Sequence, residues 1–75
     1  MTTAGKAYIV RDAEARVGPG AVTQVYPYTL HGLAAALADA RSRSLRGAAQ
    51  AVVVMTDGKS KVIRRFEDGH DVTAP

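Results

Sequence analysis

Cysteine is absent from the sequence, which excludes disulfide bonds and thiolate metal sites and fits a reducing compartment. No apolar run is long enough to cross a bilayer. The first residues also lack the basic segment followed by an apolar stretch that marks a signal peptide. We therefore expect a cytoplasmic protein with no membrane partner.

Catalytic signatures are missing as well. There is no Gly-x-Ser-x-Gly elbow, and Gly18-Pro19-Gly20 lacks the amide donors and the following helix of a phosphate-binding loop. A domain of 75 residues rarely encloses a pocket of the usual ligand volume. We therefore predict no enzyme activity, no cofactor and no small-molecule substrate.

The two histidines do not indicate a metal site. His70 lies among carboxylates in the segment 67–71, and His31 lies far from it in the sequence. A single imidazole in a polar segment lacks the surrounding groups that hold metal ligands in place. We interpret this segment as a solvated turn and predict no metal.

Charge is distributed unevenly along the chain. Residues 41–65 carry many Lys and Arg with Asp57 as their one acid, whereas residues 66–75 carry acids and no Lys or Arg. A basic patch attracts anions over a long range, although cations also simply keep a small protein in solution. The candidate nucleic-acid contacts are Arg43, Arg46, Lys59, Lys61 and Arg65.

Local patterns predict the first two strands and one helix. Residues 6–11 and 21–26 are rich in β-branched and aromatic side chains. The turn at Gly18-Pro19-Gly20 makes them a hairpin, whose connection is either all of 12–20 or a tight turn at 18–20. Thr29 offers an N-cap for a helix over 30–45, and Gly47 offers a left-handed cap at its end. The predicted buried stripe of this helix is Leu30, Leu33, Leu37, Ala40 and Ser44.

A second hairpin follows the helix. Asp57-Gly58 predicts a two-residue type I′ turn in which Thr56 faces Lys59. Alternation then divides the hairpin into two faces. We predict that the face with the larger apolar groups packs on the helix, and this face carries Ala51, Val53, Met55, Val62 and Phe66, with Arg64. The other face stays uncovered and carries Val52, Val54 and Ile63 among Lys59, Lys61, Arg65 and Glu67. A slip of one residue in register would exchange the two faces.

The three tyrosines suggest a further surface. Single-stranded nucleic acid binders place aromatic and basic side chains on one sheet face. Tyr26 and Tyr28 would share a face if their strand continued past Pro27. The alternative is that Tyr8, Tyr26 and Tyr28 fill the core and the sheet edges.

These patterns predict one α+β domain over residues 1–75, with frayed ends at 1–5 and 69–75. Its elements follow the order strand, strand, helix, strand, strand, with the helix on one face of a four-stranded, mainly antiparallel sheet, as is typical of small bacterial two-layer domains. A domain this small often depends on association, so we expect a homodimer formed through Val52, Val54 and Ile63 or through an edge strand. The alternative function is nucleic-acid binding through the basic patch.

Overall fold

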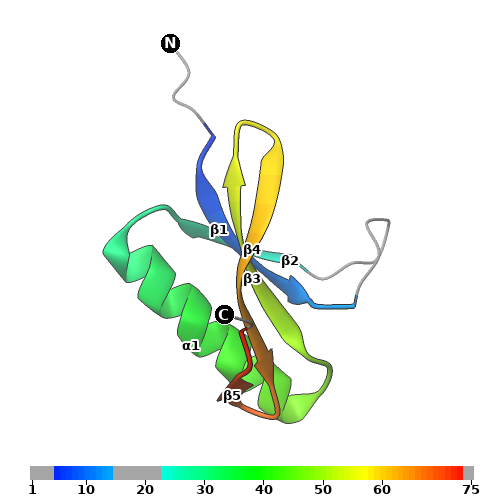
Figure 1. The fold of residues 1–75 in the computed structure, drawn as a ribbon. Helices are drawn as coiled ribbons and strands as arrows, with labels where there is room; N and C mark the ends of the chain where they lie inside the picture. The colour runs from blue at the N-terminus through cyan, green and yellow to red at the C-terminus, as the bar shows by residue number, and fades with distance from the viewer. Residues whose placement is uncertain (1–4, 15–22, 74–75) are drawn as a thin grey trace.

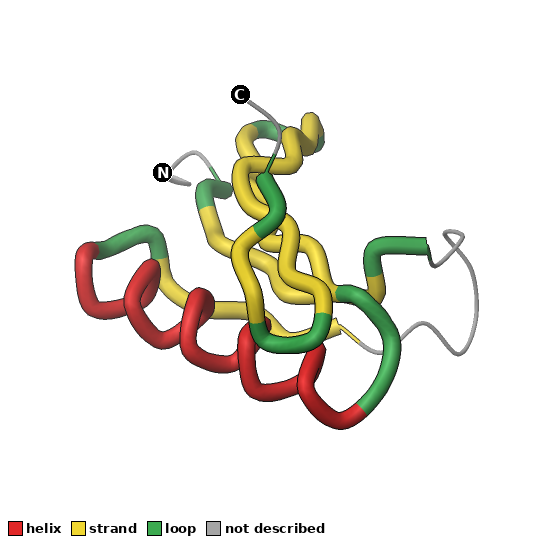
Figure 2. The backbone as a smooth tube through the Cα atoms, turned by 60° about the horizontal axis from the view of Figure 1, so that its bottom comes forward, coloured by secondary structure: helices red, strands yellow, loops and turns green. Residues whose placement is uncertain are grey.

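A computed structural model describes residues 5–14 and 23–73 of the chain. These residues form a five-stranded antiparallel sheet with one helix along one side of it (Figure 1, Figure 2). The predicted two-layer α+β class is therefore confirmed, and the sheet has one strand more than expected. The elements are β1 (Ala7–Asp12), β2 (Thr23–Pro27), α1 (Leu30–Arg46), β3 (Gln50–Thr56), β4 (Lys59–Glu67) and β5 (His70–Asp71).

Strands β1 and β2 pair antiparallel, as predicted for the first hairpin. β1 begins one residue later than the sequence pattern indicated, and the predicted start of β2 at residues 21–22 lies outside the described residues. β1 also pairs with β3, so the strand order is β2-β1-β3-β4-β5 and β1 is an interior strand. The predicted turn at Gly18-Pro19-Gly20 lies outside the described residues.

Helix α1 begins where predicted, because Thr29 Oγ1 accepts a hydrogen bond from the Gly32 amide at 2.9 Å. The predicted leucine stripe is wrong in part, since Leu30 is 86% exposed. Small side chains let the helix lie close to the sheet, and a Cβ on Gly32 would stand 1.8 Å from the Pro27 carbonyl oxygen. The left-handed cap is also wrong, because Gly47 is extended with φ −176°. The residues that α1 buries are Gly32, Ala36, Ala40 and Ser44.

The turn between β3 and β4 has the predicted form. Asp57 and Gly58 have φ of 50° and 81°, as a type I′ turn requires. Thr56 faces Lys59 across the turn. The Asp-Gly pair therefore sets the register at this end of the hairpin.

Further along the hairpin the register shifts by one residue. Val62 faces Val53, but Arg64 faces Val52, so Ile63 is an extra residue in β4. Such a bulge interrupts the alternation of side chains. Beyond the bulge, Arg64 and Phe66 lie on the helix side as predicted, whereas Val62 before the bulge lies on the opposite side from the predicted one.

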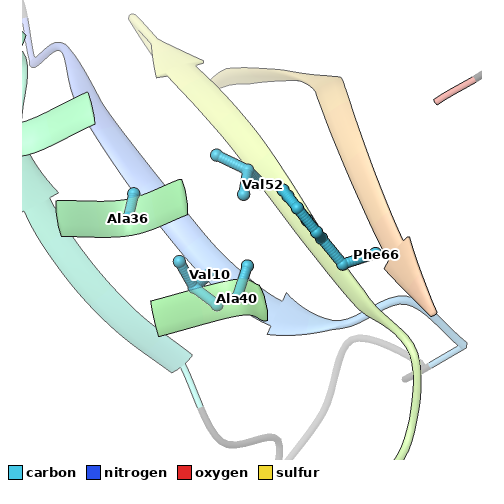
Figure 3. Packing of buried hydrophobic residues seen from close by; sticks show 5 residues of the cluster. All are labelled: Val10, Ala36, Ala40, Val52 and Phe66. Carbon is cyan, nitrogen blue, oxygen red and sulfur yellow. The ribbon is translucent and has the colours of Figure 1, made fainter. Parts of the chain in front are cut away.

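The core lies between the helix and the sheet. Val10, Val52 and Phe66 from the strands pack against Ala36 and Ala40 from α1 (Figure 3). Val10 and Val52 face each other across β1 and β3, and each is at most 1% exposed. Partly buried side chains that pack on this cluster are Tyr8, Tyr26, Leu37 and Ile63.

Strand β5 corrects the prediction of a frayed tail at 69–75, of which residues 69–73 are described. Asp68 and Gly69 form a second Asp-Gly turn with φ of 51° and 80°. The Gly69 amide donates to Ser44 Oγ at 2.9 Å, and this bond is buried. The tail is therefore attached both to the sheet and to α1.

The two edges of the sheet differ. At one edge lies β2, which carries no charged residue. At the other edge β5 pairs only with the end of β4, where Glu67 faces His70. The earlier part of β4 carries the exposed Lys59 and Lys61, and lysine on an edge strand discourages pairing with another chain.

Candidate functional site

A row of apolar side chains crosses four strands on the side of the sheet away from the helix. Val25 faces Ile9, Ile9 faces Val53, and Val53 faces Val62, and facing residues project from the same side of a sheet. Since Val52 packs on α1, its neighbour Val53 points the other way. Val25 is 61% exposed and Val62 is 50% exposed, whereas Val53 at the centre is buried.

A second row on the same side is also uncharged: Pro27 faces Ala7, Ala7 faces Met55, and Met55 faces Ser60. Charge enters only with the third row, where Arg11 faces Ala51 and Ala51 faces Arg65. In the described part of the chain, the helix packs on the opposite side of the sheet, and every strand is part of the sheet itself. We call their apolar part the open face, which consists of Ala7, Ile9, Val25, Val53, Met55 and Val62.

The predicted uncovered face is therefore wrong. Val52 is fully buried against α1, and Ile63 packs on the same cluster. Val54 faces Tyr8, which also packs on the helix side. The bulge at Ile63 explains the exchange, because it places Phe66 on the side of Val52 instead of the side of Val53. The helix covers the side that carries Phe66, as predicted, and that side therefore includes Val52.

Two of the five candidate basic residues are held by carboxylates. Arg43 Nε lies 2.8 Å from Asp39 Oδ1. Arg65 contacts Glu14 Oε1 at 2.7 Å and Glu67 Oε2 at 3.0 Å. The hydrogen bonds to Glu14 and then Glu67 raise the pKa of Arg65 above its ordinary value. An incoming phosphate would have to compete with these acids.

The remaining three candidate basic residues lie at two opposite ends of the molecule. Arg46 ends α1, whereas Lys59 and Lys61 lie near the tip of the β3–β4 hairpin, at the opposite end in Figure 1. β3 separates the two groups, and its seven residues extend about 20 Å at ~3.3 Å each. The five residues therefore do not form one patch.

A shallow cavity lies beside the end of α1. Asp12, Arg43, Arg46 and Gln50 line it, and its volume is about 240 Å³. Gln50 Nε2 donates to Asp12 Oδ1 at 2.7 Å, so two of the polar groups in the wall satisfy each other. The cavity is smaller than the 300–1,000 Å³, roughly, of most small-molecule sites.

Tyr26 connects β2 to the helix. Its hydroxyl donates to Asp39 Oδ2 at 2.6 Å, and Asp39 also pairs with Arg43. The hydrogen bond to Asp39, then burial, raises the pKa of Tyr26 above its ordinary value of 10.0. The position of this side chain is therefore explained by its structural contacts.

The side chain of Tyr28 makes different contacts from that of Tyr26. β2 ends at Pro27, so the condition under which Tyr26 and Tyr28 would share a strand face is not met. The Tyr28 ring instead stacks on Tyr8, with centroids 5.0 Å apart and planes at 25°. Lys6 Nζ lies 5.5 Å from the centroid of the Tyr28 ring. The sequence pattern did not reveal this group, because its members meet only through the turn after β2.

Residues 5–14 and 23–73 contain neither a cluster of metal ligands nor a membrane-spanning helix. No three side chains of His, Asp or Glu in these ranges lie together in a way that could hold a metal ion. The described helix is not long and apolar enough to cross a membrane. His31 and His70 are both exposed.

Comparisons of the chain with models of protein families, with curated proteins and with solved structures each returned no match. The fold therefore defines the class of protein, a small two-layer α+β domain. The surfaces described above are the basis for its proposed function.

Proposed function

We propose that the protein is a non-enzymatic interaction module that self-associates as a homodimer through the open face. The observation that carries the proposal is the apolar row across four strands, on the side of the sheet opposite α1. Its two outer members, Val25 and Val62, are at least half exposed. The exposed apolar surface thus lies toward the two ends of the row, with Val53 buried between them. Exposed apolar side chains gathered on one face are typical of interaction sites.

A second copy of the chain suits this surface better than a charged partner. The protein carries a formal net charge of +3, yet the two apolar rows contain no charged side chain. Two such surfaces can approach each other without placing like charges in contact. A two-fold arrangement uses the same surface on both copies and closes at two. Val25 lies on edge strand β2, so face packing and edge pairing would both place the partner beside this strand.

The expected affinity is modest. Full burial of a valine contributes about 1.5–3 kcal/mol, so Val25 and Val62, with 61% and 50% still exposed, contribute about 1 kcal/mol each. Both copies together gain about 4 kcal/mol from these four side chains, and association costs about 4 kcal/mol or more. Ile9 and Met55 must therefore add to the contact, and we expect a reversible dimer that dissociates on dilution.

Molar mass by light scattering over a range of protein concentrations tests the proposal. Val25→Asp and Val62→Asp place charge on the open face and should give a monomer at concentrations where the parent is a dimer. Leu30→Asp is the matched control, because Leu30 is also exposed but lies on α1. An acid in the first helical turn is compatible with the helix dipole, so this variant should remain a dimer. A parent chain that stays monomeric at every concentration would disprove the proposal.

As part of the same proposal, we expect the protein in the cytoplasm. Cell fractionation with an antibody to the chain would test this location, and recovery in the membrane fraction would contradict it.

A further inference from the structure

A second surface lies on the helix side of the sheet, near the tip of the β3–β4 hairpin. Tyr8 faces Val54 and Val54 faces Lys61. These three side chains therefore project from the same side. Lys59 is two residues before Lys61 in β4 and points the same way. Because adjacent strands lie about 4.8 Å apart, Tyr8 and Lys61 are separated by roughly 10 Å across the sheet.

The aromatic group described above completes this surface. Tyr28 stacks on Tyr8 and carries the Lys6 ammonium near its ring. Tyr28 is 48% exposed. Lysines thus lie on both sides of a stacked aromatic pair, on a sheet face. We call this the lysine–tyrosine surface, which consists of Lys6, Tyr8, Tyr28, Lys59 and Lys61.

The helix does not cover this end of the sheet. α1 buries its small residues against Val10 and Val52. In Figure 1 the helix lies below the tip of the β3–β4 hairpin. Lys6, Lys59 and Lys61 are all exposed. The surface is therefore open to a large partner.

No carboxylate of the described residues forms an ion pair with the lysines of this surface. In the described part of the chain, the four ion pairs involve arginines, and none involves these lysines. Asp57, at the tip, is the one acid between residues 50 and 65. This contrasts with Arg43 and Arg65, which their carboxylate partners already occupy.

We propose that the lysine–tyrosine surface binds single-stranded nucleic acid, with the lysines on phosphates and Tyr28 stacked on a base. Phosphate contacts provide affinity without sequence preference. Every base has a π-face that an aromatic ring can accept, but a duplex hides that face. Stacking of a base is stronger than an exposed cation–π contact, so a base can replace Lys6 on Tyr28 and release its ammonium to a neighbouring phosphate.

This binding does not depend on self-association, because the open face lies on the other side of the sheet. Lys59 and Lys61 belonged to the basic patch expected from the sequence, but the aromatic pair and Lys6 replace Arg43, Arg46 and Arg65 beside them. The proposal therefore predicts which cations matter and which do not.

A fluorescently labelled oligothymidylate of about 15 nucleotides, near the upper end of known site sizes, is a suitable probe. Its anisotropy is measured against the full chain in low salt. The double variant Lys59→Gln with Lys61→Gln should weaken binding about tenfold and make the log–log salt dependence shallower by about 1.4, for two lost phosphate contacts. The matched control, Arg41→Gln with Arg46→Gln, removes the same charge from α1 and should leave the affinity within about twofold.

Two variants of Tyr28 separate stacking from charge. Tyr28→Ala should weaken binding about tenfold, and Tyr28→Phe should restore it because the ring remains. Circular dichroism verifies that each variant is folded. Equal losses in the lysine and arginine variants would overturn the proposal, because binding would then follow net charge alone. The proposal would also be overturned if Tyr28→Ala bound the oligonucleotide as tightly as the parent, or if the parent bound a duplex with equal affinity. Absence of any binding by the parent at low salt would overturn it as well.

Discussion

Replacing Gly32 with alanine should destabilise the protein, although the same change inside an exposed helix normally stabilises it by about 1 kcal/mol. The added Cβ would lie 1.8 Å from the Pro27 carbonyl oxygen and 2.8 Å from its carbon. These are backbone atoms, so no side-chain rotation relieves the contact. Overpacking of this kind costs roughly 1–3 kcal/mol or more.

The Pro27 carbonyl, which would have to move, already accepts a hydrogen bond. Pro27 O accepts a hydrogen bond from the Thr29 amide at 2.9 Å, just before the helix begins. Losing that bond adds about 1 kcal/mol. With the helix-propensity gain subtracted, Gly32→Ala should lower the free energy of unfolding by about 1–3 kcal/mol. For a domain of this size, each 1 kcal/mol lowers the melting temperature by about 4–8 °C.

Thermal and urea unfolding, followed by circular dichroism, measure the effect. Gly47→Ala is the control, because no atom lies within 4 Å of the position of its Cβ and its backbone is extended. That variant should stay within about 0.5 kcal/mol of the parent. If Gly32→Ala melts at or above the temperature of the parent, the helix does not approach β2 as closely as described.

Three further changes test other contacts. Ser44→Ala leaves the buried Gly69 amide without its acceptor and should cost about 1–3 kcal/mol in urea; an unchanged midpoint would show that the turn adapts. Gly69→Ala should also destabilise, since φ is +80° and a Cβ would lie 2.6 Å from Leu45, and native-state hydrogen exchange should then report early opening of β5. Tyr26→Phe removes the hydrogen bond to Asp39 at a cost of about 1–2 kcal/mol near pH 7. The fold raises the pKa of Tyr26, so the stability from this hydrogen bond is complete below the ordinary value of 10.0 and is lost as pH rises above it. The difference in stability between parent and variant should therefore shrink above that pH. A difference that stays constant with pH would contradict the assignment.

Local signals in the sequence predicted the fold well where one residue pair determines the geometry. Asp57-Gly58 predicted both the turn and the pairing of Thr56 with Lys59. Thr29 predicted the start of the helix. In both cases, the cause is short-range and lies within a few residues of its effect.

Predictions that depended on long alternation were less successful. A single extra residue at Ile63 places Arg64 and Phe66 on the side of Val52, so Phe66 faces the helix as predicted, but Val53 and Val62 before the bulge lie on the side opposite to the predicted one. Nothing in the alternation of β4 marks this position as a bulge. The candidate association surface therefore moved from Val52 and Val54 to the side that carries Val53.

Strand β5 was missed for another reason. Asp68-Gly69 is the same type of turn signal as Asp57-Gly58, but the strand after it has only two residues, too few to show a periodic pattern. Its position depends on distant contacts, such as the bond from Gly69 to Ser44. The stacking of Tyr28 on Tyr8 is equally distant in sequence and was equally hidden.

The unequal edges of the sheet limit how copies of this chain can assemble. If β2 of one copy paired with the lysine-bearing edge of the next, each new copy would expose another β2, and a fibre could grow without end. Lys59 and Lys61 oppose that head-to-tail contact. If β2 instead pairs with β2 of a second copy, both uncharged edge strands are buried in the contact. The outer edges of the dimer are then the ones that carry the lysines. The arrangement of charge along the two outer strands thus favours assemblies of finite size over polymers.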